Sequence, residues 1–231
     1  QNSLSANTTG ANNLAIGKDS LATNTTADNN TAVGRSALTA NTSGNSNIAV
    51  GGYAMKTNTT GEDNSVVGKN ALCTNTSGSN HVAMGKNALY ANTTGGHNTA
   101  VGTYGLTANT TGHSNVAMGC GALAANTTAA YNIAVGRGAM AATTTGHTNT
   151  AVGQTALTVN TTGYNNISIG ASSLEANTVG YQNVAVGNSS LTSITNGDNN
   201  TGIGQSAGGN VTEGNNNVLL GQIAGTDAVR N

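Results

Sequence analysis

The chain lacks proline, tryptophan and phenylalanine, and only 6% of its 231 residues are charged. So little charge is unlike a disordered segment, which combines high net charge with the absence of a packing pattern. The formal net charge of −1 provides no electrostatic footprint for nucleic acid or for an anionic membrane surface. No apolar run approaches the roughly 20 residues of a membrane span. We therefore expect neither a nucleic-acid partner nor insertion into a membrane.

Glycine, by contrast, is abundant, and thirteen of the 33 glycines recur at a fixed spacing of seventeen residues. A fixed period this short indicates one small structural unit stacked on itself many times, which is a solenoid rather than a globular domain. We predict an all-β fold, a parallel β-solenoid or β-roll of about thirteen 17-residue coils, forming a single array over residues 1–231 of a longer protein. The glycines of this register, called the key glycines below, are Gly17, Gly34, Gly51, Gly68, Gly85, Gly102, Gly119, Gly136, Gly153, Gly170, Gly187, Gly204 and Gly221.

Stacking identical coils turns each position of the repeat into a column. The residue before each key glycine is Ile, Val, Met or Leu, as at Val33, and from Leu21 to Leu191 a Leu or Met stands four residues after it, as at Leu38. We interpret these two columns as the interior, which places Ala32 and Asn30 on the outer face. Branched and small residues alternate as in a strand, so we predict two short strands per coil, one ending near Val33 and one over Leu38 to Thr42.

The turns and the polar columns also follow the repeat. Each coil has two turn glycines, for which we predict positive φ, and the second turn tolerates Ala27 and Ala129. Asn stands four residues before every key glycine except at His81, and Thr stands eight residues after each one from Thr25 to Thr212. Stacked Asn amides can hydrogen-bond along the stack, and Thr hydroxyls can do the same or bond the turn backbone. These columns predict structural ladders.

The predicted core is thin, because each coil offers one large aliphatic side chain at each of two places plus Ala. An outer face of Ala and Asn would suit close packing against other chains. We therefore predict a homo-oligomer, with three chains about one axis as the commonest way to build a fibre, either intertwined or side by side.

Residues for catalysis or metal binding do not come together in the repeat. No paired carboxylates, no Ser with His and acid in register, and no phosphate-binding loop emerge, so we expect no enzyme activity and no cofactor. His113 and His147 share a column but lie two coils apart, roughly 10 Å, which is too far for one metal ion. His81 is either a substitution within the Asn ladder or an axial residue that meets its symmetry mates. Cys73 and Cys120 occupy different columns and are expected to be free thiols.

Two edges of the repeat carry the remaining distinctive side chains. Cations follow the key glycine at Lys18, Arg35, Lys69, Lys86 and Arg137, where charge keeps the protein soluble and its strands unjoined by neighbours. Rings occupy the columns five and six residues before the key glycine, and we predict a surface ligand contact there, a glycan stacking on flat rings. The alternative is a ring ladder that only stabilises the fold. The candidate contact residues are Tyr131, His147, Tyr164 and Tyr181.

The segment Asn30-Thr31-Ala32-Val33-Gly34, followed by Ala37-Leu38, resembles the head repeats of trimeric autotransporter adhesins. The longer unit with its Asn-Thr-Thr-Gly turn is similar to shaft repeats of bacteriophage tail fibres. The segment 217–221, followed by Ala224-Gly225-Thr226-Asp227, is similar to tail-fibre sequences that continue into a C-terminal tip or a trimerising chaperone domain. The resemblance implies a left-handed parallel β-roll and a trimer, and it assigns no functional residue.

These observations favour a structural fibre segment of a virion appendage, a phage tail fibre that spaces a receptor-binding tip from its anchor. Its partners would be copies of itself and a glycan or receptor on the host surface. The alternative is a bacterial cell-surface adhesin or extracellular filament protein, so the expected location is the virion or the cell exterior. A further alternative is an ice-binding protein, because regular Thr columns on a flat β-solenoid face could order water.

Overall fold

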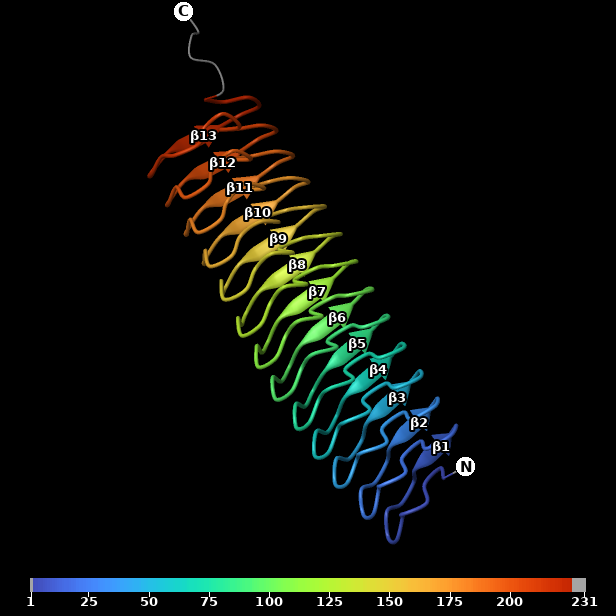
Figure 1. Cartoon of the computed structure of the whole chain (residues 1–231). Helices are drawn as coiled ribbons and strands as arrows, with labels where there is room; N and C mark the ends of the chain where they lie inside the picture. The colour runs from blue at the N-terminus through green and yellow to red at the C-terminus, as the bar shows by residue number, and fades with distance from the viewer. Residues whose placement is uncertain (1, 226–231) are drawn as a thin grey trace, which may run out of the picture. The chain divides into compact units, whose positions relative to one another are not determined.

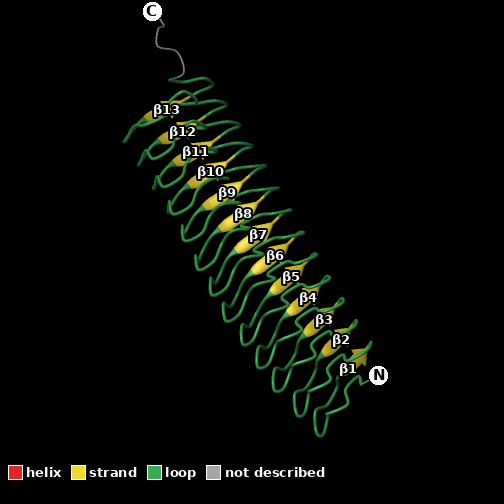
Figure 2. Cartoon of the chain, viewed as in Figure 1, coloured by secondary structure: helices red, strands yellow, loops and turns green. Residues whose placement is uncertain are grey.

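A computed structural model describes residues 2–225 as an all-β parallel β-solenoid of about 12 turns. It divides into two compact units, Gln1–Asn115 and Val116–Asn231. The described residues contain no helix (Figure 2), and thus none that is long and apolar enough to cross a membrane. The β-solenoid class is therefore confirmed, whereas the single array over 1–231 stays a prediction.

The first unit stacks six strands in chain order (blue to green in Figure 1). Neighbouring strands are parallel and keep one register, so that Thr31 lies opposite Ile48 and Val33 opposite Val50. Each strand therefore lies directly against the equivalent strand of the next coil. The six are β1 (Leu14–Ile16), β2 (Thr31–Val33), β3 (Ile48–Val50), β4 (Ser65–Val67), β5 (Val82–Met84) and β6 (Thr99–Val101).

The second unit repeats this arrangement with seven strands (green to red in Figure 1). Pairing is again parallel and in register, as between Ile167 and Val184. The same seventeen-residue repeat therefore gives the same coil in both units. The seven are β7 (Val116–Met118), β8 (Ile133–Val135), β9 (Thr150–Val152), β10 (Ile167–Ile169), β11 (Val184–Val186), β12 (Thr201–Ile203) and β13 (Val218–Leu220).

Each coil has one strand, so the second strand predicted over Leu38 to Thr42 is wrong (Figure 2). The reason is backbone conformation, because Ser36 and Leu38 have φ of 54° and 52°, in the left-handed region. Their N–H groups still bond neighbouring coils. Ser36 donates to the Lys18 carbonyl at 2.8 Å and Leu38 to the Ala54 carbonyl at 3.0 Å. This side of the coil is thus hydrogen-bonded between coils without being a β-strand.

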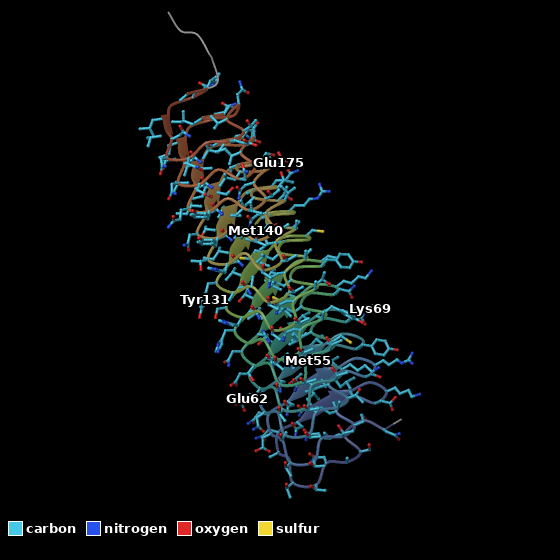
Figure 3. All side chains as sticks on the ribbon, turned by 60° about the vertical axis from the view of Figure 1, so that its left-hand side comes forward. Met55, Glu62, Lys69, Tyr131, Met140 and Glu175 are labelled. Carbon is cyan, nitrogen blue, oxygen red and sulfur yellow. The ribbon has the colours of Figure 1, made fainter. Side chains whose placement is uncertain are left out.

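One of the two columns predicted to form the interior does so, and the other does not. The column four residues after the key glycine is confirmed as core, with no exposed surface from Leu21 to Leu191, including Met55 and Met140 (Figure 3). The other predicted core column is wrong, because Ala32 is buried whereas the Val33 column points outward.

A narrow interior explains the reversal. Successive residues of a strand face opposite sides, so only the middle residue of each three-residue strand faces inward. A methyl group built on Gly202, the middle residue of β12, would lie 2.7 Å from the Leu191 Cγ. Leucine from the turn therefore fills the space beneath the strand, and the inward middle residue is small in most strands, with Val66 a buried exception.

The Asn column before the strand is confirmed as a ladder, but its predicted place on the outer face is wrong, because Asn30 and Asn47 have no exposed surface. The Asn47 backbone N–H donates to the Asn30 Oδ1 at 3.0 Å, and the Asn47 Nδ2 donates across the coil to the Gly61 carbonyl at 2.9 Å. The Thr column bonds the turn backbone, as where the Thr59 Oγ1 donates to the Thr76 carbonyl at 2.9 Å. Both columns therefore satisfy polar groups that the coil turns would otherwise leave unpaired.

A second buried Asn column was not predicted. It stands seven residues after the key glycine, where the Asn58 Nδ2 donates to the Asn41 Oδ1 at 3.0 Å and to the Gly61 carbonyl at 2.9 Å. Thr143 and Ile194 interrupt this ladder in the second unit. There the buried Thr143 Oγ1 and Asn177 Oδ1 have no hydrogen-bond partner among the described residues.

The two turn glycines differ in what they require. Gly51 and Gly68 have φ of 136° and 147°, so the predicted positive φ is confirmed for the key glycines. For the second turn it is wrong, since Gly44 and Gly61 are not among the described positive-φ residues. A Cβ on Gly61 would instead collide with the Gly78 carbonyl oxygen of the next coil. The second turn therefore needs small residues for the close approach of backbones.

Candidate functional site

The outward side chains of the strands form an exposed apolar surface in each unit. Exposed fractions include 44% for Ile48, 41% for Val67 and 44% for Met84. The third residue of every strand is apolar, and the first is apolar or a small hydroxyl residue such as Thr31. We call these first and third strand residues the apolar strip. In the first unit they are Leu14, Ile16, Thr31, Val33, Ile48, Val50, Ser65, Val67, Val82, Met84, Thr99 and Val101, and in the second Val116, Met118, Ile133, Val135, Thr150, Val152, Ile167, Ile169, Val184, Val186, Thr201, Ile203, Val218 and Leu220.

The repeat makes each strip regular. Parallel in-register pairing places equivalent side chains in adjacent coils about 4.8 Å apart. Val, Ile and Thr suit such a pleated surface because their branched side chains pack well against neighbours on the same face. Within each unit the strip is therefore a ladder of apolar side chains on the outside of the solenoid.

Opposite charges border the strip in the first unit. Cations follow the key glycine at Lys18, Arg35, Lys69 and Lys86, on the margin where each strand ends. Acids stand five or six residues before the key glycine, on the margin where each strand begins, and Figure 3 shows Glu62 and Lys69 on opposite sides of the coils. We call these the basic and the acidic margin, and the acidic one holds Asp28, Glu62 and Asp63.

Two cations of the basic margin lie over tyrosine rings. The Arg35 guanidinium carbon is 5.4 Å from the Tyr53 ring centroid, and the Lys86 Nζ is 5.7 Å from that of Tyr104. Such contacts are weakly attractive and keep the cation near the ring. Asp19, two residues after the key glycine Gly17, is an acid that stands beside the basic margin of the first unit.

The candidate ligand contact contains the stack that the sequence predicts. The His147 and Tyr164 ring centroids are 5.3 Å apart, and those of Tyr164 and Tyr181 are 4.9 Å apart with an interplanar angle of 2°. Tyr131, the fourth candidate, is 60% exposed. The nearby Asp198 carboxylate raises the pKa of Tyr181 and also accepts the Tyr181 backbone N–H at 3.0 Å. The ring ladder is thus confirmed, whereas ligand binding by it stays a prediction.

His81 is confirmed as a substitution within the Asn ladder, and the alternative that it meets symmetry mates is wrong. Its side chain is 1% exposed, and its Nδ1 accepts the Asn98 backbone N–H at 3.2 Å. Burial lowers the pKa of His81 to about 4, against the smaller opposing effect of hydrogen bonding with the Gly95 and Asn98 backbone. The imidazole is therefore neutral at pH 7, and a protonated ring could not accept the Asn98 N–H.

This burial predicts a pH-dependent loss of stability. The unfolded chain takes up a proton on His81 below about pH 6.5, whereas the folded chain resists it down to about pH 4. Stability is therefore fully present above pH 6.5 and falls towards pH 4. His81→Asn, which restores the repeat residue, should remove this term. Between pH 7 and pH 4.5, we expect the free energy of unfolding of the wild type to fall by about 2–3 kcal/mol more than that of the variant.

Urea denaturation followed by circular dichroism at the two pH values measures this difference. The exposed histidines and the carboxylates are common to both proteins and cancel in the comparison. Parallel pH profiles for the two proteins would show that His81 is not held neutral by the fold.

Metal-ligating side chains do not gather among residues 2–225, where no group of three or more His, Cys, Asp or Glu could hold a metal ion. Cys73 and Cys120 are free, as predicted. Cys73 is buried, which raises the pKa of its thiol, and Cys120 is exposed. No family model, curated protein or solved structure matches the chain. Any functional assignment therefore depends on the geometry of the surfaces.

The apolar strip is the surface that the sequence analysis placed on the wrong side. A signal for its orientation exists in the middle strand column, which holds Ala in nine of the described strands, Ser168 or Gly202 in two, and the larger Val66 and Leu219 in the remaining two. A predominance of small residues is what a narrow interior beneath a leucine favours. The first strand column, by contrast, varies from Thr31 to Ile48 to Ser65, as solvent-facing positions do.

Proposed function

We propose that the chain is a structural segment of a fibre, in which copies of the chain associate side by side through the apolar strip. The observation that supports this most directly is the strip itself, because the strand side chains that usually face a core here face outward. Contiguous exposed apolar surface of this kind is typical of interaction sites. The proposed role is mechanical, without enzymatic chemistry and without a cofactor.

A second copy of the chain is the partner that fits the strip. The strip repeats with the seventeen-residue period of the coils, so a covering surface needs the same spacing over many coils. Another copy offers that spacing, and its margins carry charges opposite to those it would meet. We propose a homotrimer, as the resemblance to autotransporter heads and tail-fibre shafts implies, with the strips turned towards a common axis.

The fibre is proposed to belong to a virion appendage, a phage tail fibre that holds a receptor-binding part away from its anchor. A cell-surface adhesin or extracellular filament would use the same architecture. Flanking sequence distinguishes them, because an anchor with a signal peptide indicates an adhesin and a baseplate-binding segment indicates a tail fibre. The location is accordingly the virion or the cell exterior.

The stacked rings offer a second surface for host contact. His147, Tyr164 and Tyr181 form a continuous face of flat rings with polar tips. Tyr131, in the adjacent column of the same side, adds a further exposed ring. Sugar rings stack on such faces and bond to polar tips. We propose that this flank makes a weak contact with a surface glycan while the fibre supplies the reach.

The oligomeric state tests the proposal. Light scattering should give the wild type three times the chain mass of 22.6 kDa. The double variant Ile167→Lys with Ile169→Lys places two charges on the strip at residues that are 41% and 40% exposed, and should give a lower mass. The control Val159→Lys with Val179→Lys changes residues that are 39% and 47% exposed but lie off the strip, and should leave the mass unchanged.

A monomeric wild type would overturn the proposal. A monomer that also shows thermal hysteresis would instead support the ice-binding alternative, which depends on the regular Thr columns rather than on the strip. Unequal masses for strip and control variants would support the strip as the interface, and equal ones would place the interface elsewhere.

A further inference from the structure

Two coils of the first unit carry opposite charges on their two margins, whereas the coils of Lys18 and Lys86 have no acid on the acidic margin. In the coil of β2, Asp28 stands on the acidic margin and Arg35 on the basic margin. In the coil of β4, Glu62 and Asp63 stand on the acidic margin and Lys69 on the basic margin. Every coil of this unit with an acid before its strand therefore has a cation after it.

Symmetry decides which margins meet when copies associate through the strip. If the copies run in the same direction around an axis parallel to their strips, the basic margin of each copy faces the acidic margin of the next. If two copies face each other in opposite directions, with a two-fold axis along the strands, like margins meet and cation faces cation. Opposite charges thus favour the first arrangement, and like charges penalise the second.

The same charges distinguish axial positions. With no shift between copies, Asp28 faces the level of Arg35, and Glu62 faces the level of Lys69. A shift of one coil in either direction puts one of the two acidic levels opposite Gly52, which carries no charge. Both acidic levels are paired only when the copies are level.

We propose that the two charged margins set the direction and the axial register of self-association, with Lys69 of one copy pairing with Glu62 and Asp63 of the next, and Arg35 with Asp28. This inference rests on the proposed function, which supplies the association through the strip. The strip itself repeats every coil, so shifted arrangements bury similar apolar surface and are poorly distinguished. Exposed ion pairs add little affinity, but they are sufficient to select among arrangements that are otherwise nearly equal.

The participating side chains are available for this role. Arg35, Glu62, Asp63 and Lys69 are exposed, and Asp28 is half-buried. One oxygen of Asp28, Oδ1, accepts the Ala11 backbone N–H at 2.7 Å within its own chain. The second oxygen of this carboxylate can still accept a cation from a neighbour.

Cross-linking between copies tests direction and register. Glu62→Cys and Lys69→Cys are each made in a Cys120→Ser background, where the remaining Cys73 is buried. The two variants are then co-expressed or kept separate, treated with a short bismaleimide and separated on a denaturing gel. We expect covalent dimers in the co-expressed sample and none in the separate ones. A chain with both substitutions should give closed covalent rings whose size reports the number of copies.

A charge-reversal cycle tests the ion pairs themselves. Lys69→Glu and Glu62→Lys should each weaken association about two- to fivefold per contact at low salt, and the double variant should recover most of the loss. High salt should abolish these differences. Glu175→Lys is the control, since this acid stands five residues after the key glycine Gly170 and outside both margins.

The outcomes separate the two proposals. Dimers from Lys69→Cys alone, or an associated wild type without coupling between residues 62 and 69, would overturn the charged-margin inference while leaving the fibre proposal intact. A monomeric wild type would overturn both.

Discussion

Gly51→Ala is expected to destabilise the first unit by at least about 4 kcal/mol, whereas Gly52→Ala, one residue further along, should leave its stability nearly unchanged. Gly51 is a key glycine with a φ of 136°, a conformation that residues with a Cβ rarely adopt. Its N–H also donates to the Val33 carbonyl at 2.8 Å, which joins adjacent coils.

Space is as restrictive as conformation at this position. A Cβ on Gly51 would lie 2.5 Å from the Gly68 carbonyl oxygen and 2.7 Å from the Gly68 carbonyl carbon. Both atoms belong to backbone, so relief requires the coils to move apart and break the ladder. Gly52 meets nothing within 4 Å of its Cβ and is not in the left-handed region, so it is a matched control.

Urea denaturation followed by circular dichroism measures both variants. A Gly51→Ala protein within about 1 kcal/mol of the wild type would contradict the account, because neither its strain nor its collision would then cost what the geometry requires. Equal losses in the two variants would indicate a general effect of alanine in this turn rather than the demands of the key glycine.

Leu157→Ala is the second large effect, with an expected loss of about 3 kcal/mol from the free energy of unfolding. Leu157 has no exposed surface and is the large aliphatic side chain that its coil contributes to the interior. The backbone of the neighbouring coils is held by inter-coil hydrogen bonds, including that from the Leu157 N–H to the Ser173 carbonyl at 2.9 Å. The coils therefore cannot collapse into the space, and a cavity remains.

Val159→Ala, two residues later, is the control for this prediction. Val159 is 39% exposed and lies off the strip, so we expect its truncation to cost less than about 1 kcal/mol. Chemical denaturation of both variants gives the comparison. A loss for Leu157→Ala as small as that for Val159→Ala would mean that the leucine column does not form the core.

Parts of this architecture depend on repetition and could be predicted from the chain. The key glycines, the leucine column and the Asn column before the strand each follow from one residue type recurring every seventeen positions. A repeated residue stacks on its own copies, so its chemistry is enough to indicate a turn, a core or a ladder. The stack of His147, Tyr164 and Tyr181 was predictable for the same reason.

Other parts depend on how one coil closes on itself. Ser36 and Leu38 have side chains compatible with a strand, and only their left-handed backbone shows that the second strand does not form. The second Asn column, at Asn41 and Asn58, was missed because a turn Asn is usually explained by its own turn. Its amides point inward and bond from coil to coil, which a linear reading does not reveal.

By itself, the sequence determined that this protein is a β-solenoid of repeated coils, which residues form its turns, and which leucine column forms its core. Only the tertiary structure decided which way each strand faces. In Thr31-Ala32-Val33 the end residues and the middle residue are similarly apolar. Alternating hydrophobicity therefore does not show which face of the strand points to solvent. The leucine beneath the strand decides it, because the space that it leaves is narrow and the middle residue is Ala in nine of the thirteen described strands, with Val66 and Leu219 as the larger exceptions. A middle residue that faces inward turns Val33 and its equivalents outward and creates the strip through which we propose that the fibre assembles.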